Sequence, residues 1–269
     1  MCKSDISRYL GHIINGDNVD VLSEIDSACV DLVVTSPPYD NLRDYKKDAV
    51  WSFDSFKKIA TQLFRVVKNG GVVVWVVGDS VVNGNKSLTS YRQALYFQQI
   101  GFNVYDVIIY EKAGTAPPHK NRYFNAYEYM FVLSKGLPKT INIIKDKPNK
   151  WAGSSTFGEV TRRERDGTLT NKGKKVINEY GTRTNIWRYN NGKGFATKDE
   201  IAYKHPAIFP EKLAEDHIIS WSNEGDIVLD PFCGSGTVPK IASLLNRKWL
   251  GIEISKEYCE IANKRLGIE

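Results

Sequence analysis

Short valine-rich runs that alternate with helical patterns constrain the fold of this chain more than any other feature. Residues 30–34 read VDLVV and residues 71–77 read GVVVWVV. Between them, apolar residues recur at helical spacing over 53–67, and the NGG sequence at 69–71 ends this pattern as a helix C-cap does. Such β-branched runs are typical of strands buried on both faces of a sheet. We therefore expect the order strand, helix, strand.

The same alternation returns along most of the chain. Further helices are predicted at about 90–100, 238–246 and after 254, and further strands at 103–110, 127–133, 226–230 and 248–254. Alternating strands and helices predict an α/β sheet with right-handed crossovers.

Residues 135–200 interrupt this rhythm. They are rich in Asn, Gly, Thr, Lys and Arg and show no sustained period of two or 3.6. Fifteen basic and seven acidic residues give them a net charge of +8, whereas the rest of the chain carries −2 of the total +6. We expect a body formed by residues 1–134 and 201–269, with a basic region at 135–200.

Composition excludes several classes of protein. With 269 residues, 42% hydrophobic and 25% charged, the chain has the composition of a globular protein rather than a disordered or fibrous one. The longest apolar run, at 72–77, is far shorter than the roughly 20 residues of a membrane helix, and the first residues lack a secretory signal pattern. The four cysteines and four histidines are widely separated, so we expect no metal site, no disulfide framework and a cytoplasmic location.

The first motif that carries chemistry is TSPPY at 35–39, directly after the strand VDLVV. Ligands of open α/β sheets bind at the carboxyl ends of strands. Two prolines remove two N–H donors, so carbonyl oxygens and the Ser36 hydroxyl remain as acceptors, which suits an amino group. Tyr39 adds an aromatic face for a planar ring. The alternative is a rigid proline turn that only leaves the strand.

The second motif is DPFCGSGT at 230–237, again between a strand and a helix. Its glycines let the backbone approach a ligand closely, and Glu253 ends the next strand, where an acidic side chain binds ribose hydroxyls. Because the third glycine of G-x-G-x-x-G is missing, NAD is disfavoured. Asp230 would repel a pyrophosphate and favours a cationic ligand, such as an amino-acid ammonium. The alternative for each residue is a turn, a helix cap or core packing.

Together the two motifs resemble those of the amino-group DNA methyltransferases, which use S-adenosyl-L-methionine. TSPPY before the glycine loop is similar to the circularly permuted β group, and Ser36 before the prolines is similar to its cytosine-N4 branch. Segments at 15–17, 65–71 and 205–210 also resemble the family, although Phe209 stands where Lys is common. The resemblance implies a Rossmann-like methyltransferase fold with a mixed, circularly permuted seven-stranded sheet, its last two strands an antiparallel pair at the edge.

The resemblance also implies roles for residues. The expected cofactor, S-adenosyl-L-methionine, would be bound by Asp17, Thr35, His205, Pro206, Ala207, Phe209, Asp230, Pro231, Phe232, Gly234, Ser235, Gly236, Thr237 and Glu253. The expected catalytic group is Ser36, Pro37, Pro38 and Tyr39. In this interpretation Ser36 Oγ and the Pro37 carbonyl hold the two hydrogens of cytosine N4, while Tyr39 stacks on the flipped base.

The basic stretch 135–200 falls where the group places its target recognition region. Candidate DNA contacts are Arg162, Arg163, Arg165, Lys172, Lys174, Lys175, Arg183 and Arg188. Four aromatic residues of this stretch, Trp151, Tyr180, Trp187 and Tyr189, are expected either to stack on DNA or to form a small core.

The leading hypothesis is a site-specific methyltransferase for cytosine N4 in double-stranded DNA, as part of a restriction-modification system. Its possible partner is a cognate restriction endonuclease, and monomer and homodimer both remain open. Three alternatives are adenine-N6 methylation with the same machinery, a catalytically inactive DNA-binding relative, and an NAD-linked oxidoreductase, which the glycine pattern disfavours.

Overall fold

A computed structural model describes residues 5–38, 51–113, 121–156 and 158–268 of the chain. Two compact units are distinguished: a body formed by residues 1–142 and 185–269, and a small unit formed by residues 143–184. Within the described residues, no helix combines the length and the apolar character that crossing a membrane requires.

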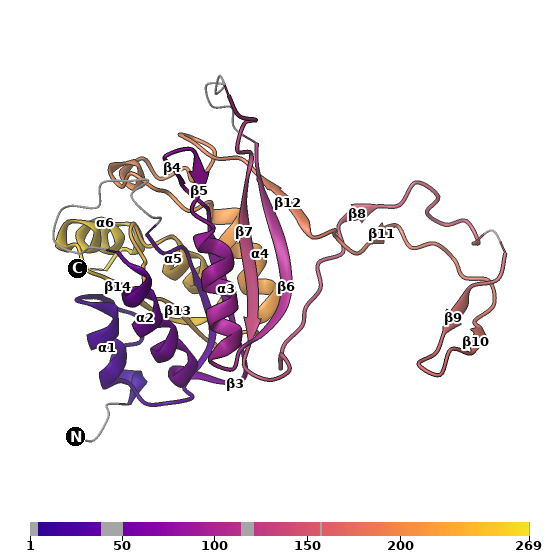
Figure 1. Cartoon of the computed structure of the whole chain (residues 1–269), viewed down its shortest axis with the longest axis horizontal. Coiled ribbons are helices and arrows are strands. Elements are labelled where there is room, and N and C mark those ends of the chain that lie inside the picture. Colours follow the sequence, from indigo (N-terminus) through magenta and orange to yellow (C-terminus); the bar gives the residue numbers. More distant parts are fainter. Residues whose placement is uncertain (1–4, 39–50, 114–120, 157, 269) are drawn as a thin grey trace. The chain divides into compact units, whose positions relative to one another are not determined.

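The body is built on a mixed sheet (Figure 1). Among the described residues this sheet has eight strands, in the spatial order β1 (Ile13–Asn15), β14 (Lys248–Glu253), β13 (Ile227–Asp230), β2 (Val30–Thr35), β3 (Val67–Val77), β7 (Tyr127–Ser134), β6 (Asn103–Lys112) and β12 (Ile186–Tyr189). Strand β7 runs antiparallel to both of its neighbours, and the other pairs are parallel. Two strands from the end of the chain therefore lie beside strands from its beginning, as the circular permutation predicts.

Helices flank the sheet (Figure 1). They are α1 (Asn18–Glu24), α2 (Phe53–Val66), α3 (Thr89–Gln99), α4 (Glu211–Trp221), α5 (Thr237–Leu244) and α6 (Lys256–Leu266), with short 3₁₀ turns η1 (Ile6–Arg8) and η2 (Glu200–Lys204) and a small hairpin of β4 (Val81–Val82) and β5 (Asn85–Lys86). Along the chain, α1 contacts α2 and α2 contacts α3, while α4 contacts α5 and α5 contacts α6. The expected alternation of strands and helices is confirmed.

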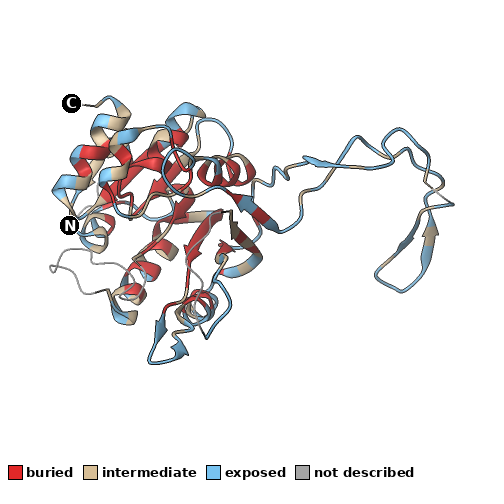
Figure 2. Ribbon diagram, turned by 90° about the horizontal axis from the view of Figure 1, so that it is seen from above, coloured by how far each residue is buried: buried red, intermediate tan, exposed pale blue. Residues whose placement is uncertain are grey.

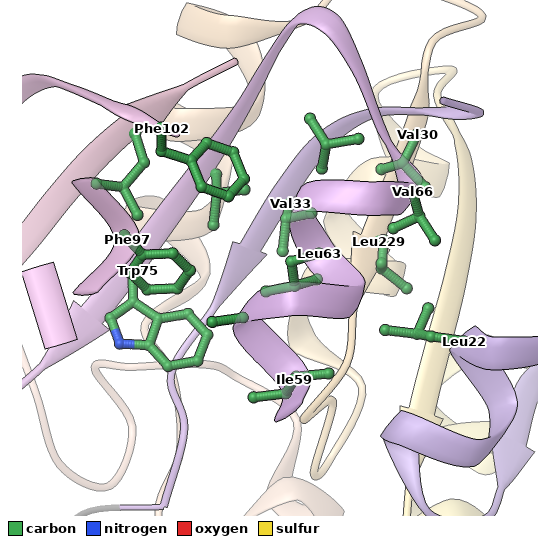
Figure 3. Close-up of a cluster of buried hydrophobic side chains, with 14 of the residues drawn as sticks. Leu22, Val30, Val33, Ile59, Leu63, Val66, Trp75, Phe97, Phe102 and Leu229 are labelled. Carbon is green, nitrogen blue, oxygen red and sulfur yellow. The ribbon is translucent and has the colours of Figure 1, made fainter. Parts of the chain in front are cut away.

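Helix α2 shows why this part of the sequence folds as it does. Ser52 caps its first turn, since its hydroxyl accepts a hydrogen bond from the N–H of Ser55 at 3.1 Å. Its buried side chains, which include Ile59 and Leu63, recur every three or four residues along one face. That face packs on the sheet beside Trp75 of β3 (Figure 3), and burial is concentrated there and in the strands (Figure 2).

The sheet differs from the prediction at one edge. Strand β12 pairs with β6, so the sheet has eight strands rather than seven and the antiparallel pair does not form its edge. Trp187 and Tyr189 of β12 are buried, and the Tyr189 hydroxyl donates to Asp216 at 2.7 Å. These two aromatic residues therefore form a small core. A four-residue strand with two alternating buried positions is too short to give a periodic signal.

The small unit, residues 143–184, is narrower than the predicted region at 135–200. It contains two short antiparallel ribbons, one of β8 (Lys147–Pro148) with β11 (Tyr180–Gly181) and one of β9 (Thr161–Arg163) with β10 (Leu169–Asn171). Most of its described residues are exposed (Figure 2). Trp151 and Tyr180 are among the exposed residues. Backbone pairing, side-chain hydrogen bonds such as that of Thr170 with Glu164, and an ion pair of Arg183 with Asp146 hold the unit together, and none of its described residues is a buried hydrophobic one.

Candidate active site

The two motifs meet at the carboxyl ends of the neighbouring parallel strands β2 and β13. Thr35, the last residue of β2, donates a hydrogen bond from Oγ1 to Oδ1 of Asp230, the last residue of β13, at 2.6 Å. Both residues are buried. Residues that lie 195 positions apart in the chain are thus joined at one point of the sheet.

Asp230 is a buried carboxyl group with few compensating partners. Its Oδ1 also accepts a hydrogen bond from the N–H of Phe232 at 3.1 Å. The pKa of Asp230 is raised to about 7, mainly by burial and to a smaller extent by the charge of Glu253, while the hydrogen bonds from Thr35 and Phe232 oppose the rise. A cation bound beside Asp230 would reverse the shift, so this part of the site favours a positively charged group.

The glycine loop between β13 and α5 can only form without side chains at two positions. Gly234 and Gly236 have φ values of +50° and +79°. A Cβ on Gly234 would lie 2.9 Å from His205 Nε2, and one on Gly236 would lie 2.8 Å from the Cβ of Ala262. Glycine is therefore required for both the backbone conformation and the close packing.

Glu253, at the end of β14, borders this loop. Its Oε2 accepts from the N–H of Gly234 and its Oε1 accepts from the N–H of Ser255, both at 2.9 Å. Burial raises the pKa of Glu253, while these backbone donors lower it. Each oxygen keeps a further lone pair, so the carboxylate can accept two hydroxyl groups of a ligand while it stays fixed.

The turn between β1 and α1 lies against the same loop. Asn18 donates from Nδ2 to the carbonyl of Pro231 at 3.1 Å, and the N–H of Gly16 donates to the carbonyl of Glu253 at 3.1 Å. Asp17 caps α1, because its Oδ1 accepts from the N–H groups of Val19 and Asp20. The predicted Asp17 thus comes close to Glu253 and Pro231, and its carboxylate serves at least as a helix cap.

The segment 205–210 contacts the glycine loop through His205, which lies against Gly234. His205 is buried, hydrogen-bonds through Nδ1 to the backbone of Ala207, and lies with its ring 4.3 Å from the ring of Tyr258. Ala207 and Phe209 are half-buried, whereas Pro206 is exposed. The ring of Phe232 is in edge contact with Trp51 at 5.3 Å.

The rest of the TSPPY motif, which we call the acceptor motif, directly follows the junction of Thr35 with Asp230. Ser36 is half-buried, Pro37 is buried and Pro38 is half-buried, and all three follow Thr35 at the end of β2. Tyr39, the fourth predicted catalytic residue, lies outside the described residues.

The eight basic residues predicted to contact DNA fall into two groups in the structure. Six basic residues of the 143–184 unit are exposed: Arg162, Arg163, Arg165, Lys172, Lys174 and Lys175. Arg183 is instead engaged with Asp146, and Arg188 lies in β12 of the body, 3.9 Å from Glu111. Arg188 is exposed as well, so seven of the eight predicted residues are accessible to phosphates.

Sequence reasoning missed a group of charged residues below the glycine loop. Arg265 of α6 donates to the carbonyl of Ser235 at 2.7 Å and to the hydroxyl of Thr237 at 3.1 Å. Ser235 and Thr237 are buried, so both help to hold the loop from beneath. No sequence signal identifies Arg265, because its partners lie about 30 residues away and follow no motif.

Comparison with known proteins is consistent with this geometry. The model of the N6/N4 DNA methylase family matches residues 30–264. The orphan methyltransferase M.BamHII of Bacillus amyloliquefaciens is 55% identical over 243 residues, which cover 90% of each chain.

Two solved structures share the fold. The PvuII DNA methyltransferase, described as cytosine-N4-specific, superposes with a TM-score of 0.68 at 20% identity and covers 93% of this chain and 84% of its own. A putative DNA modification methylase of Thermus thermophilus, complexed with S-adenosyl-L-methionine, gives 0.63 at 24% identity and covers 95% and 93%. The chain belongs to the N6/N4 family of DNA methylases.

Proposed function

We propose that this DNA methyltransferase transfers a methyl group from S-adenosyl-L-methionine to the N4 amino group of cytosine in double-stranded DNA. The observation that carries this proposal is the junction of Thr35 with Asp230, which puts the acceptor motif next to the glycine loop. Ser36 directly follows Thr35, and a serine in this place is the feature that resembles the cytosine-N4 branch.

The cofactor is S-adenosyl-L-methionine, and the residues at the loop fit it. The close packing at Gly234 and Gly236 leaves the loop backbone as the contact surface. Asp230 suits the ammonium of the methionine part, and Glu253 suits the two ribose hydroxyls. Phe232, in edge contact with Trp51, offers an apolar wall between them.

When bound, S-adenosyl-L-methionine supplies a methyl group that its sulfonium already activates. The chain must then orient a weak nucleophile, since the lone pair of cytosine N4 is delocalised into the ring. Ser36 Oγ and the Pro37 carbonyl accept the two N4 hydrogens, which reduces that delocalisation and directs the lone pair at the methyl group. Pro37 and Pro38 contribute no N–H that would compete for these acceptors.

The exposed basic residues of the 143–184 unit suit phosphate contacts. With ten basic and five acidic residues, the unit carries a net charge of +5. Among the described residues of the unit, Arg183 forms an ion pair with Asp146. Most of the other basic side chains of the unit form no such pair there. We assign DNA binding to this unit, with its six exposed arginines and lysines as the main contacts.

A restriction-modification system is the biological context we assign, with a cognate nuclease as a possible partner. The M.BamHII relative is named an orphan methyltransferase, whereas a relative of Bacillus subtilis, M.BglII, is named a Type II methyltransferase. Both kinds of setting occur among the relatives, and a nuclease encoded beside this chain distinguishes them.

Adenine-N6 methylation is the second candidate, because the family comprises both kinds of enzyme. The same acceptor pair would hold the N6 hydrogens of adenine, so the geometry alone favours neither base. The serine at position 36 favours cytosine. An inactive DNA-binding relative, the third candidate, predicts no transfer of label from radioactive S-adenosyl-L-methionine to DNA.

Substitution of Ser36 tests the proposed chemistry. We expect Ser36→Ala to lower single-turnover methyl transfer by about 100-fold or more, because one of two N4 hydrogen acceptors is lost. Cofactor affinity, measured by calorimetry, is expected to stay within about twofold, since Ser36 does not hold the cofactor in this account. Ser23→Ala, an exposed serine of α1, is the matched control. Unchanged transfer by Ser36→Ala contradicts the proposed role.

A further inference from the structure

Four charged residues form a cluster next to the glycine loop, which Arg265 contacts at Ser235 and Thr237. Lys240 of α5 and Arg265 of α6 each bind both Asp199 and Glu211, with nitrogen to oxygen distances of 2.7 to 3.0 Å. The Arg265 side chain has no exposed surface, and the other three are between 21% and 31% exposed. Such pairs are screened much less by solvent than pairs on the surface.

The two acidic residues stand at the two ends of one segment. Asp199 precedes η2, and Glu211 is the first residue of α4. Between them lie residues 200–210, which include the buried His205 that packs on Gly234. Because the same two cations bind both ends, the cluster closes this segment into a loop of fixed span.

Arg265 joins this segment to the glycine loop. Its Nη1 donates to the carbonyl of Ser235 at 2.7 Å, to the Ser235 hydroxyl at 3.1 Å and to the Thr237 hydroxyl at 3.1 Å. Its Nε and Nη2 point to Asp199 and Glu211. All three nitrogens of one planar guanidinium are thus used, an arrangement that a lysine ammonium cannot reproduce.

The pKa directions agree with a paired cluster. Burial alone would raise the pKa of Asp199, but hydrogen bonds from Lys240 and Arg265 hold it below its ordinary value. Burial likewise lowers the pKa of Lys240, and Asp199 and Glu211 raise it above the ordinary value. Asp199 and Lys240 are therefore both charged at neutral pH.

We propose that Arg265 is a positioning residue for cofactor binding: it holds the glycine loop and the segment 200–210 together as two walls of one site. Arg265 fixes the Ser235 carbonyl, and the loop conformation at Gly234 and Gly236 depends on that carbonyl. The position of His205 depends on the two ends of segment 200–210, which Lys240 and Arg265 hold through Asp199 and Glu211. The proposal rests on S-adenosyl-L-methionine as cofactor, and it does not depend on which base is methylated.

The test compares Arg265→Lys with a matched control, Arg247→Lys, in the full-length protein. Arg247 also donates to backbone and side-chain oxygens, those of Ser222 and Leu245, but within the described part of the chain it makes no hydrogen bond to either wall. Calorimetry measures the affinity for S-adenosyl-L-methionine and for its demethylated product, S-adenosylhomocysteine. We expect Arg265→Lys to weaken both affinities about tenfold or more, because charge-assisted hydrogen bonds to the loop are lost.

Two further readouts separate positioning from loss of stability. We expect Arg265→Lys to raise the KM for the cofactor about tenfold or more. The kcat measured at saturating cofactor is expected to change by less than about threefold, and so is the affinity for DNA. Amide hydrogen exchange at residues 232–237 is expected to accelerate in Arg265→Lys and not in Arg247→Lys. Glu211→Gln, which keeps the shape and removes one charge, is expected to shift affinity in the same direction by less.

Three outcomes overturn the proposal. One is a cofactor affinity of Arg265→Lys equal to that of the unsubstituted protein. Another is an equal loss of affinity in Arg247→Lys, which would make the effect one of general stability. A third is failure of the unsubstituted, folded protein to bind the cofactor, which removes the cofactor assignment itself and is recognised without any variant.

Discussion

At the scale of single residues, Asp230 has the most unusual chemistry in the site. It is buried, it is joined to Thr35, and its pKa is raised to about 7 mainly by burial. A cation placed beside it stabilises the charged form and lowers that pKa. Binding of a ligand ammonium is therefore linked to release of a proton in the pH range just below neutrality.

This linkage gives a prediction for cofactor binding. At about pH 6.5 we expect S-adenosyl-L-methionine to release a fraction of a proton on binding, and its affinity to rise as the pH increases towards 7 and then to level. Calorimetry in two buffers with different ionisation enthalpies measures the released protons. In Asp230→Asn, which keeps an acceptor for Thr35, we expect the release to vanish. The same proton release from Asp230→Asn would show that another group is responsible.

Asp230 makes the stability of the unliganded protein change with pH in the opposite direction to cofactor affinity: the free energy of unfolding falls as the pH rises. The ordinary pKa of the group is 3.8 and the folded-state value is about 7, so the folded state binds more protons between these pH values. The contribution of this proton to the free energy of unfolding is fully present below pH 3.8 and is lost as the pH approaches 7. Ionisation of Asp230 near neutral pH thus lowers the free energy of unfolding, but it provides the negative charge that suits the ligand ammonium.

At the scale of elements, the strands that position the site were predictable because each is a buried run next to a glycine or proline motif. Residues 30–35 and 227–230 carry their motifs at their carboxyl ends, and adjacent parallel strands bring such ends together. The hydrogen bond of Thr35 with Asp230 follows from that adjacency.

Other elements were not predictable for physical reasons. Strand β12 has only four residues, and its pairing with β6 is decided by burial of Trp187 and Tyr189 against α4. The cluster around Arg265 joins elements that are 28 to 66 residues apart and uses residue types that are ordinary on any surface. Local sequence patterns do not predict pairing between residues so far apart in the chain.

The ribbon of β9 and β10 yields a prediction for the small unit. It carries Arg162 and Arg163, and Arg165 follows in the adjoining turn. We expect replacement of these three by serine to weaken DNA binding and to reduce the slope of log affinity against log salt by about 0.9 for each lost phosphate contact. Cofactor affinity is expected to stay constant. The measurement is fluorescence anisotropy of labelled duplex DNA at several salt concentrations, and an unaltered slope would exclude these arginines as phosphate contacts.

At the scale of the whole molecule, the division of charge matches the division of labour that we propose. The unit 143–184 carries +5, so the remaining residues carry +1 of the total of +6. The body holds the junction of the two motifs, and the unit holds exposed basic residues without a core of its own. We therefore propose that the body carries out the chemistry and that the unit attaches to DNA.

The central claim is that this chain methylates cytosine at N4. The most direct measurement is mass spectrometry of nucleosides from DNA of a methylation-deficient host that expresses the protein, with the Ser36→Ala variant as control. We predict N4-methylcytosine with the unsubstituted protein, little or none with Ser36→Ala, and no N6-methyladenine in either. Appearance of N6-methyladenine instead would contradict the claim and would assign the same site to adenine.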